Sequence, residues 1–350
     1  MTNRENYLSI GRRTGYEKMP VHMELSPNIE AQLREYERTH DLGIVPQVVE
    51  IPDLTVEFPA REVYLAYYDR ELRPDTEIDF RGVAWEPADG AYHMKKLYHP
   101  MEDFDSVEQI LAYPLPDYAA GSAQAQQEAV RHAHEQELAA MGWMTTTVWE
   151  SAWYLRGMEN LMVDMLDESP MAEALLDRLT NNSILRAESF ARSGADAIFL
   201  GDDIGMQKSI MMSEQTYCTW IKPRLARVIA AAKAIKPDIL VFYHTCGYVT
   251  PLIPHLIDAG IDVLDPVQPE CMDFAEIHAQ FGDRLSFHGT IGTQSTMPYG
   301  TPEDVRREVF RNLEIAGAHG GLYVAPSHVV EPEVPLENLI AYIKACQDFI

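Results

Sequence analysis

The clearest regularity along this chain is a repeated change between short apolar runs and longer segments with helical spacing of apolar residues. Beyond about residue 122, the apolar runs predict strands at 144–149, 197–200, 239–243, 263–264, 285–287 and 322–325. The longer segments predict helices at 123–140, 155–166, 171–193, 213–235, 250–259, 273–281 and 302–316, and after Pro335. Short apolar runs bounded by polar turns are typical of buried strands, and longer periodic segments are typical of helices.

Strands that alternate with helices in this way predict a parallel sheet with helical crossovers. Roughly eight such units, counting some within the first third of the chain, favour an α/β fold of the closed (β/α)8 (TIM) barrel type over an open sheet. In such a barrel, the residues that follow the strands surround one pocket, where the chemistry of the protein takes place.

The first third has a different pattern, rich in proline, tyrosine and charge. A helix is predicted at 28–41 after Ser26-Pro27, a hairpin strand at 79–86 and a short helix at 107–112. We expect 1–120 to be an N-terminal extension or lid packed on a barrel formed mainly by 121–350, within one structural domain. Its aromatic residues form either that lid or ordinary packing: Tyr64, Tyr67, Tyr68, Trp85 and Tyr92.

The strongest chemical signal is His244-Thr-Cys246 at the end of the predicted strand 239–243. Residues two apart on an extended chain point to the same face, so the imidazole and the thiol lie together. Both are good zinc ligands. The other predicted strand ends carry Glu150, Asp202 with Asp203, Asp265 with Gln268, His288, and Ser327 with His328. We therefore expect these residues to converge at one end of the barrel.

Each of these residues also has a structural interpretation. Glu150 can cap a helix, and Asp202 or Asp203 can accept hydrogen bonds from turn amides. His244 can be a neutral core histidine and Cys246 a small buried hydrophobe. Paired aspartates at one turn would also raise each other's pKa, as is common at functional sites.

Composition excludes some classes of function. The net charge of −26 and the pI near 4.7 argue against binding to nucleic acid or to anionic lipid. We find neither an apolar signal core at the N-terminus nor an apolar run long enough to span a membrane. The four cysteines lack the spacing of a disulfide framework, which favours a reducing cytoplasm: Cys218, Cys246, Cys271 and Cys346. Of these, Cys271 is either a further ligand or an inert loop thiol.

Four stretches resemble the uroporphyrinogen decarboxylase superfamily. They are GADAIFLGDDIG (194–205), YHTCGYVTPLIPHLIDAGIDVLDPVQPE (243–270), FGDRLSFHGTIGTQSTMPYGTPEDV (281–305) and GGLYVAPSHVVEPEVPLENL (320–339). The resemblance runs from about Trp143 to the C-terminus and implies a (β/α)8 barrel. The decarboxylases of this superfamily carry an N-terminal Arg-x-Ala-Gly-Arg-Tyr pattern, for which Arg12-Arg13-Thr14-Gly15-Tyr16 is a poor substitute.

The chain is more similar to the zinc methyltransferases of the superfamily, which exchange methyl groups with cobalamin on corrinoid proteins. In that branch a His-x-Cys pair and a third ligand, usually cysteine, hold the zinc. The resemblance therefore implies His244 and Cys246 as ligands, with His328 or Cys271 as the third. It also implies Glu150 as a carboxylate near the metal or in its fourth position, and Asp202 or Asp203 as a residue that orients a ligand or anchors substrate.

The sequence thus favours a zinc-dependent methyltransferase that moves a methyl group between a small O-, N- or S-methyl compound and the cobalamin of a corrinoid protein. Histidine in place of the third cysteine makes the zinc a stronger Lewis acid, which favours polarising oxygen or nitrogen over activating a thiolate. Two alternatives stay open at this point. One is a metal-free decarboxylase-like lyase that uses Asp202 or Asp203 with His328, and the other is a non-catalytic tetrapyrrole-binding barrel.

Overall fold

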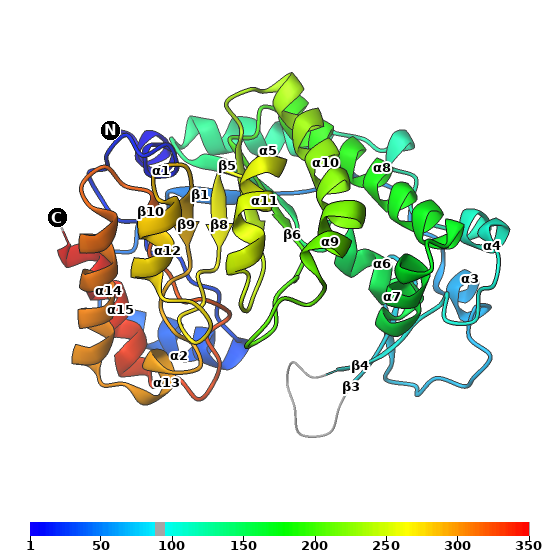
Figure 1. The fold of residues 1–350 in the computed structure, drawn as a ribbon. Coiled ribbons are helices and arrows are strands. Elements are labelled where there is room, and N and C mark those ends of the chain that lie inside the picture. Colours follow the sequence, from blue (N-terminus) through cyan, green and yellow to red (C-terminus); the bar gives the residue numbers. More distant parts are fainter. Residues whose placement is uncertain (88–94, 350) are drawn as a thin grey trace.

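The computed structural model describes residues 1–87 and 95–349, and its centre is a curled sheet of seven strands (Figure 1). Every neighbouring pair in the sheet is parallel, and the order across it follows the chain: β1-β5-β6-β7-β8-β9-β10. The strands are β1 (Val48–Ile51), β5 (Ala139–Met144), β6 (Ala197–Gly201), β7 (Leu240–His244), β8 (Val263–Asp265), β9 (Ser286–His288) and β10 (Leu322–Tyr323). This is the predicted α/β architecture of the TIM-barrel type.

Helices connect the strands and cover the outside of the curled sheet (Figure 1). Their bounds are α1 (Asn3–Gly11), α2 (Pro27–Glu37), α3 (Arg61–Leu65), α4 (Val107–Ala112), η1 (Tyr118–Ala120), α5 (Gln124–Glu135), α6 (Trp149–Arg156), α7 (Met158–Leu166), α8 (Pro170–Ser193), α9 (Glu214–Thr216), η2 (Tyr217–Ile221), α10 (Lys222–Ile235), η3 (Thr250–Leu252), α11 (Ile253–Ala259), α12 (Phe274–Phe281), α13 (Thr296–Tyr299), α14 (Pro302–Ala316) and α15 (Leu336–Asp348). No described helix is both long and apolar enough to cross a membrane.

The two faces of the strands build two separate apolar clusters, as the alternation of side chains along a strand requires. Outward residues such as Ile198 and Val241 pack beneath the helices in the larger cluster. Inward residues such as Phe199 and Phe242 form a smaller cluster inside the barrel. Helix α1 completes this inner cluster with Tyr7, Leu8 and Ile10.

Helix α1 closes the end of the barrel at which the strands begin. The Ile10 carbonyl accepts a hydrogen bond from the Gly321 amide, 2.9 Å away, just before β10. The Arg4 guanidinium pairs with Asp196, just before β6, at 2.7 Å. The opposite end, where the strands finish, is left for the polar residues that follow them.

No described strand joins β10 to β1. Segment 17–25 runs along this opening, since Leu25 forms an isolated parallel bridge with Val330 and the Tyr342 hydroxyl donates to the His22 carbonyl at 2.7 Å. To the barrel, the first third of the chain therefore supplies strand β1, the closing helix α1 and segment 17–25 beside the open edge.

A second, three-stranded antiparallel sheet lies apart from the barrel strands (Figure 1). It comprises β2 (Glu77–Ile78), β3 (Ala84–Pro87) and β4 (Lys95–Tyr98). The strand predicted at 79–86 is confirmed only for 84–86, because 79–83 form the turn between β2 and β3. Of the predicted aromatic residues, Tyr64 and Tyr67 pack against Tyr113, and Tyr92 lies outside the described residues. The division into 1–120 and 121–350 stays a prediction.

One predicted strand is wrong. The segment 144–149 is not a strand: β5 occupies Ala139–Met144 and Trp149–Arg156 forms α6. Ala139 and Ala140 favour a helix by intrinsic propensity, so the helix predicted at 123–140 extended too far; α5 ends at Glu135. Pairing with β1 and β6 outweighs that propensity. As a consequence, Glu150 does not follow a strand but stands in the first turn of α6.

Candidate metal centre and adjoining cavity

The register of the sheet aligns the polar residues at its open end. His244 pairs with Gly201 of β6 on one side and with Asp265 of β8 on the other. His244 lies two residues beyond Phe242 and therefore points into the barrel as Phe242 does. The His244 Nδ1 atom lies 2.6 Å from Asp265 Oδ2, and His288 of β9 bonds the other oxygen of the same carboxylate. His22 continues the row, with its Nδ1 2.8 Å from His288 Nε2.

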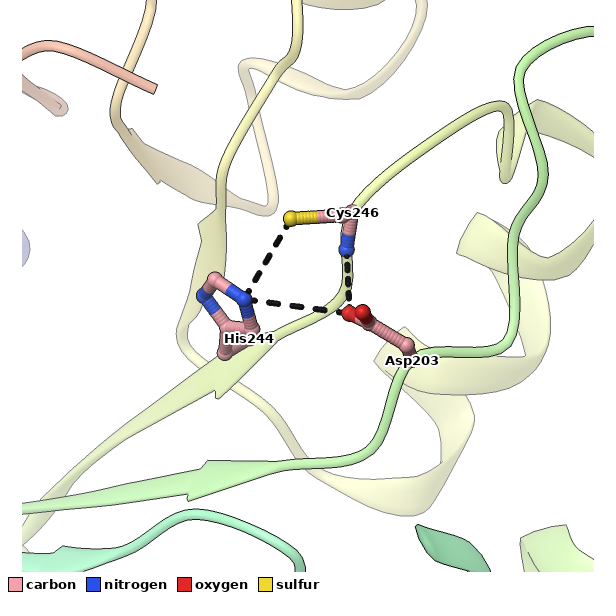
Figure 2. A group of neighbouring side chains, drawn as sticks. All are labelled: Asp203, His244 and Cys246. Carbon is pink, nitrogen blue, oxygen red and sulfur yellow. Dashed lines mark hydrogen bonds and ion pairs between the residues drawn. The ribbon is translucent and has the colours of Figure 1, made fainter. Parts of the chain in front are cut away.

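Three possible metal ligands come together at the ends of β6 and β7: Asp203, His244 and Cys246 (Figure 2). One donor atom of each lies within 4.8 Å of the other two. The Cys246 Sγ is 3.4 Å from His244 Nε2, which in turn is 3.7 Å from Asp203 Oδ1. Because Asp265 bonds Nδ1 of His244, the other ring nitrogen, Nε2, faces the Cys246 thiol and the Asp203 carboxylate.

The loops after β6 and β7 fix this group by packing against each other. The Cys246 amide donates to Asp203 Oδ1 at 2.7 Å, and the Tyr248 amide donates to the Met206 carbonyl at 2.7 Å. Gly247 has a φ of +88°, and a Cβ there would lie 2.7 Å from the Met206 carbonyl oxygen. Glycine is required here for both reasons.

The residues around His244 favour a positive charge on its ring. Burial alone would lower the pKa of His244, but the bonds to Asp265 and Cys246 hold that pKa well above its ordinary value. Burial likewise opposes ionisation of Asp265, yet His288 and His244 keep its pKa well below the usual range. Burial raises the pKa of the Cys246 thiol, with His244 opposing that shift. A divalent cation could supply the positive charge in place of the imidazolium proton.

The geometry suits zinc. With Zn–S of about 2.3 Å and Zn–N or Zn–O of about 2.0–2.2 Å, tetrahedral ligands lie about 3.3–3.6 Å from one another. The distances of 3.4 Å and 3.7 Å from His244 Nε2 to its neighbours are within a few tenths of an ångström of these values. Asp265 behind His244 also reproduces the carboxylate–histidine arrangement that orients metal-binding imidazoles.

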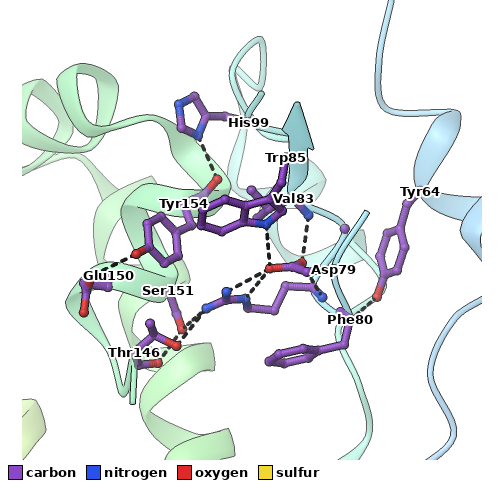
Figure 3. Close-up of polar contacts among 12 residues, drawn as sticks. Tyr64, Asp79, Phe80, Val83, Trp85, His99, Thr146, Glu150, Ser151 and Tyr154 are labelled. Atoms are coloured by element: carbon purple, nitrogen blue, oxygen red, sulfur yellow. Dashed lines mark hydrogen bonds and ion pairs between the residues drawn. The ribbon is translucent and has the colours of Figure 1, made fainter. Parts of the chain in front are cut away.

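The two other predicted carboxylates make different contacts. Glu150 accepts from the Tyr154 hydroxyl at 2.9 Å and from the Asp203 amide at 3.2 Å, as Figure 3 shows for the tyrosine. Burial and the nearby Asp203 raise the pKa of Glu150. Asp202 accepts from the amides of Val148 and Glu150 at 3.0 Å and 2.9 Å, which is the structural interpretation of this residue. Burial and Glu150, rather than Asp203, raise the pKa of Asp202 to about 8.

The two candidates for the third ligand lie outside the group of three. His328 is exposed and lines the same cavity as His244. The Cys271 thiol is 3.5 Å from Gln207 Oε1. The third residue of the group is instead Asp203. The structure therefore brings together Asp203, which was predicted as catalytic, and His244 and Cys246, which were predicted as ligands. Ligand roles for Glu150 and His328 stay predictions.

A cavity adjoins the metal group and extends towards the closed end of the barrel. Its outer part has a volume of about 270 Å³ and includes His244, Asp265 and His328. Its inner part has a volume of about 320 Å³ and reaches Tyr7 of α1. These volumes are appropriate to a small ligand. Neither lysine nor arginine appears among the described residues that line the two parts.

Sequence reasoning placed Asp265 and His288 at strand ends but gave them no role. Their link to His244 depends on which strands are neighbours and in what register, and the signal available was the two-residue spacing Val263-x-Asp265. His22 and Glu24 also line the cavity, and no periodic pattern marked them. They come from segment 17–25, whose position is set by tertiary contacts.

Comparisons with known proteins agree with this architecture. A sequence profile described as "Uroporphyrinogen decarboxylase (URO-D)" matches residues 82–349. A methylated-thiol–coenzyme M methyltransferase of Methanosarcina mazei is 28% identical over 217 residues, which are 59% of this chain and 52% of that protein. A uroporphyrinogen decarboxylase of Pelodictyon phaeoclathratiforme is 27% identical over 180 residues, 50% of this chain and 48% of that protein. The chain spans about half the length of the curated relatives it matches.

Among solved structures, a methyltransferase from Methanosarcina mazei aligns with a TM-score of 0.68. The alignment covers 100% of this chain and 99% of that chain at 20% sequence identity. At this identity the likeness concerns the fold.

Proposed function

Because the chain belongs to the uroporphyrinogen decarboxylase (URO-D) family, as its sequence predicted, we propose that it is a zinc-dependent methyltransferase of that family. The observation that carries the proposal is the group Asp203, His244 and Cys246, with Asp265 fixing the imidazole from behind. A lyase that works without a metal has no use for a thiol and an imidazole held at ligand spacing. The methyltransferase among the curated relatives supports the same branch.

Each side chain has a definable task in this proposal. Asp203, His244 and Cys246 would hold the zinc, which when bound supplies a Lewis acid for the heteroatom that carries the methyl group. Asp265 keeps Nδ1 of His244 protonated and leaves Nε2 free for the ion. The Cys246 amide fixes the Asp203 carboxylate. The cavity beside His244 would hold the substrate.

We infer that the methyl group passes between a small O-, N- or S-methyl compound and the cobalamin of a separate corrinoid protein. The open end of the barrel is the side on which such a partner would dock, since α1 closes the other end. The exposed His328 stands at that open end, beside the cavity. A cytoplasmic setting fits the proposal because Cys246 must stay reduced, outside any disulfide, to bind zinc.

The lining of the cavity argues against the decarboxylase alternative. A tetrapyrrole with acetate side chains needs cationic partners for its carboxylates, because buried charges must be paired. Glu24, Glu50 and Asp265 line the cavity, and lysine and arginine are missing from the described lining. A polycarboxylate would therefore meet like charge there.

Methyl transfer to reduced free cobalamin tests the proposal, with the absorbance change of the cobalamin as the measurement. Zinc-loaded protein should transfer a methyl group from at least one member of a panel of methyl ethers, amines, ammonium compounds, thioethers and sulfonium compounds. His244→Ala and Cys246→Ser should abolish transfer and bound zinc together, because each removes a ligand. Cys218→Ser is the matched control, since Cys218 lies in η2, outside the ligand group. Failure of transfer across the whole panel would contradict the proposal.

A further inference from the structure

The cavity beside the metal group has an acidic lining that the proposed reaction leaves unexplained. The outer and inner parts share five lining residues: His22, Glu24, Trp143, Phe199 and His288. The two parts therefore adjoin and form one space that leads into the barrel. Of the metal group, His244 alone appears in the described lining of this space. Val48 and Glu50 of β1 close its far side, two residues apart on the same face of the strand.

Two carboxylates face this space without a cationic partner among the described residues. Both Glu24 and Glu50 line the inner part, and their side chains are exposed. Burial and the nearby Asp265 raise the pKa of Glu24, with His244 and His288 opposing that shift. A ligand with a positive charge would supply a cationic partner.

Three histidines of the lining, His22, His244 and His288, make hydrogen bonds with one another or with Asp265. Burial and the neighbouring His288 lower the pKa of His22 to about 3, so His22 is neutral at physiological pH. Asp265 bonds the rings of both His244 and His288. Among the described residues, no side chain forms a hydrogen bond or ion pair with the carboxylates of Glu24 and Glu50, so both remain available to a ligand.

The wall beside these carboxylates is aromatic. Trp143 of β5 and Phe199 of β6 are paired across the two strands, and their rings stack with centroids 3.9 Å apart and planes 2° from parallel. Phe242 of β7 continues the row, 6.1 Å from Phe199. An aromatic wall next to carboxylates is the chemical environment that recognises methylated cations, which are too weakly hydrated to prefer water strongly.

We propose that this cavity binds a small methylated onium cation, a quaternary ammonium or sulfonium compound, between Glu24, Glu50 and the Trp143–Phe199 wall. The inference rests on the proposed function and names its substrate class. A quaternary nitrogen has no lone pair for zinc, so the lone pair that the departing amine or thioether gains is the one on which zinc would act as a Lewis acid.

In the transfer, the carbon–nitrogen or carbon–sulfur bond to one methyl group breaks, and its electron pair stays on nitrogen or sulfur. The methyl carbon bonds to cobalt of the reduced corrinoid, which supplies the new electron pair. The product is a neutral thioether or a tertiary amine, which can take up a proton from solvent. The acidic cavity should therefore hold the uncharged thioether less tightly than the sulfonium cation.

Binding is tested first, by calorimetry on the zinc-loaded full chain. The probes are choline and 3,3-dimethylbutan-1-ol, a neutral compound of the same shape with carbon in place of nitrogen. Choline should bind at least about tenfold more tightly, because both the charge and the cation–π contact are lost in the neutral compound. The double variant Glu24→Gln, Glu50→Gln should remove this preference, whereas Glu30→Gln on the exposed side of α2 should keep it. Equal binding of the two probes would overturn the inference.

Transfer to reduced free cobalamin then separates this inference from the proposed function. Tetramethylammonium and trimethylsulfonium distinguish the two kinds of cation, and anisole and dimethyl sulfide are neutral methyl donors. Faster transfer from either cation than from both neutral donors supports the inference. Transfer from the neutral donors alone overturns the inference and leaves the proposed function standing. If no donor reacts, the proposed function fails, and the calorimetric comparison alone decides whether the cavity selects cations.

Discussion

At the scale of single residues, the chemistry of this chain depends on the two-residue spacing of extended backbone. That spacing puts Phe242 and His244 on the inner side of the barrel. Cys246 follows in the loop after β7 and lies beside His244, and the sequence predicted these two residues as a pair. Asp203 was predicted as a site residue but not as a possible metal ligand. Its place beside His244 and Cys246 depends on the packing of two loops against each other, around Gly247. No local pattern encodes that contact.

Asp265 provides the sharpest prediction at this scale. Asp265→Asn should lower the affinity for zinc by about 10–100-fold, because the amide no longer fixes the His244 tautomer as the carboxylate does. Competition with a zinc chelator of known affinity measures the change. The protein should remain folded, since the asparagine keeps the shape of the side chain.

Asp262→Asn is the matched control for this variant. Asp262 lies three residues earlier, where its carboxylate pairs with Lys233 at 2.9 Å, before the start of β8. Its replacement should leave zinc affinity unchanged. An equal effect of both substitutions, or none from Asp265→Asn, would show that Asp265 does not orient the ligand.

At the scale of elements, the turn between β5 and α6 connects the small antiparallel sheet to the site. Arg81 is buried and donates to Asp79 at 2.8 Å, to Thr146 at 2.9 Å and to Ser151 at 3.0 Å. Its guanidinium also lies 5.1 Å from the centre of the Tyr154 ring, whose hydroxyl bonds Glu150 (Figure 3). The sequence predicted the hairpin but not this connection, because the contact joins residues about seventy positions apart.

This connection predicts a large loss of stability for Arg81→Met. Removing the guanidinium takes the charged partner from Asp79 and a hydrogen-bond donor from two hydroxyl groups, which should lower the free energy of unfolding by about 3–5 kcal/mol. Urea denaturation, followed by circular dichroism, measures the loss.

Arg73→Met is a close control, because Arg73 bonds Asp75 through the same two kinds of nitrogen at 3.1 Å and 2.9 Å. Both of these side chains are about half exposed, at 47% and 51%, so the expected loss is below about 1 kcal/mol. If Arg81→Met and Arg73→Met lowered the free energy of unfolding equally, the burial of Arg81 would not be the source of its contribution, and the prediction would be wrong.

At the scale of the whole molecule, the two ends of the barrel have different roles: one contributes to stability and the other carries the candidate site. Helix α1, Asp196 and the inner apolar cluster close the end where strands begin, and the ligand group stands where strands finish. Alternation of apolar runs and helices was sufficient to predict this architecture. The open edge between β10 and β1 was not predictable, because segment 17–25 has no periodic pattern of its own and is held by long-range contacts such as Leu25 with Val330.

The claim on which the account depends is that His244, Cys246 and Asp203 hold a single zinc ion. X-ray absorption at the zinc edge, on the purified chain and on Cys246→Ser, tests it most directly. The account predicts one Zn–S distance of about 2.3 Å with nitrogen and oxygen at about 2.0–2.2 Å, and loss of the sulfur in the variant. A zinc environment without sulfur in the unmodified chain, or one that the variant leaves unchanged, would contradict it.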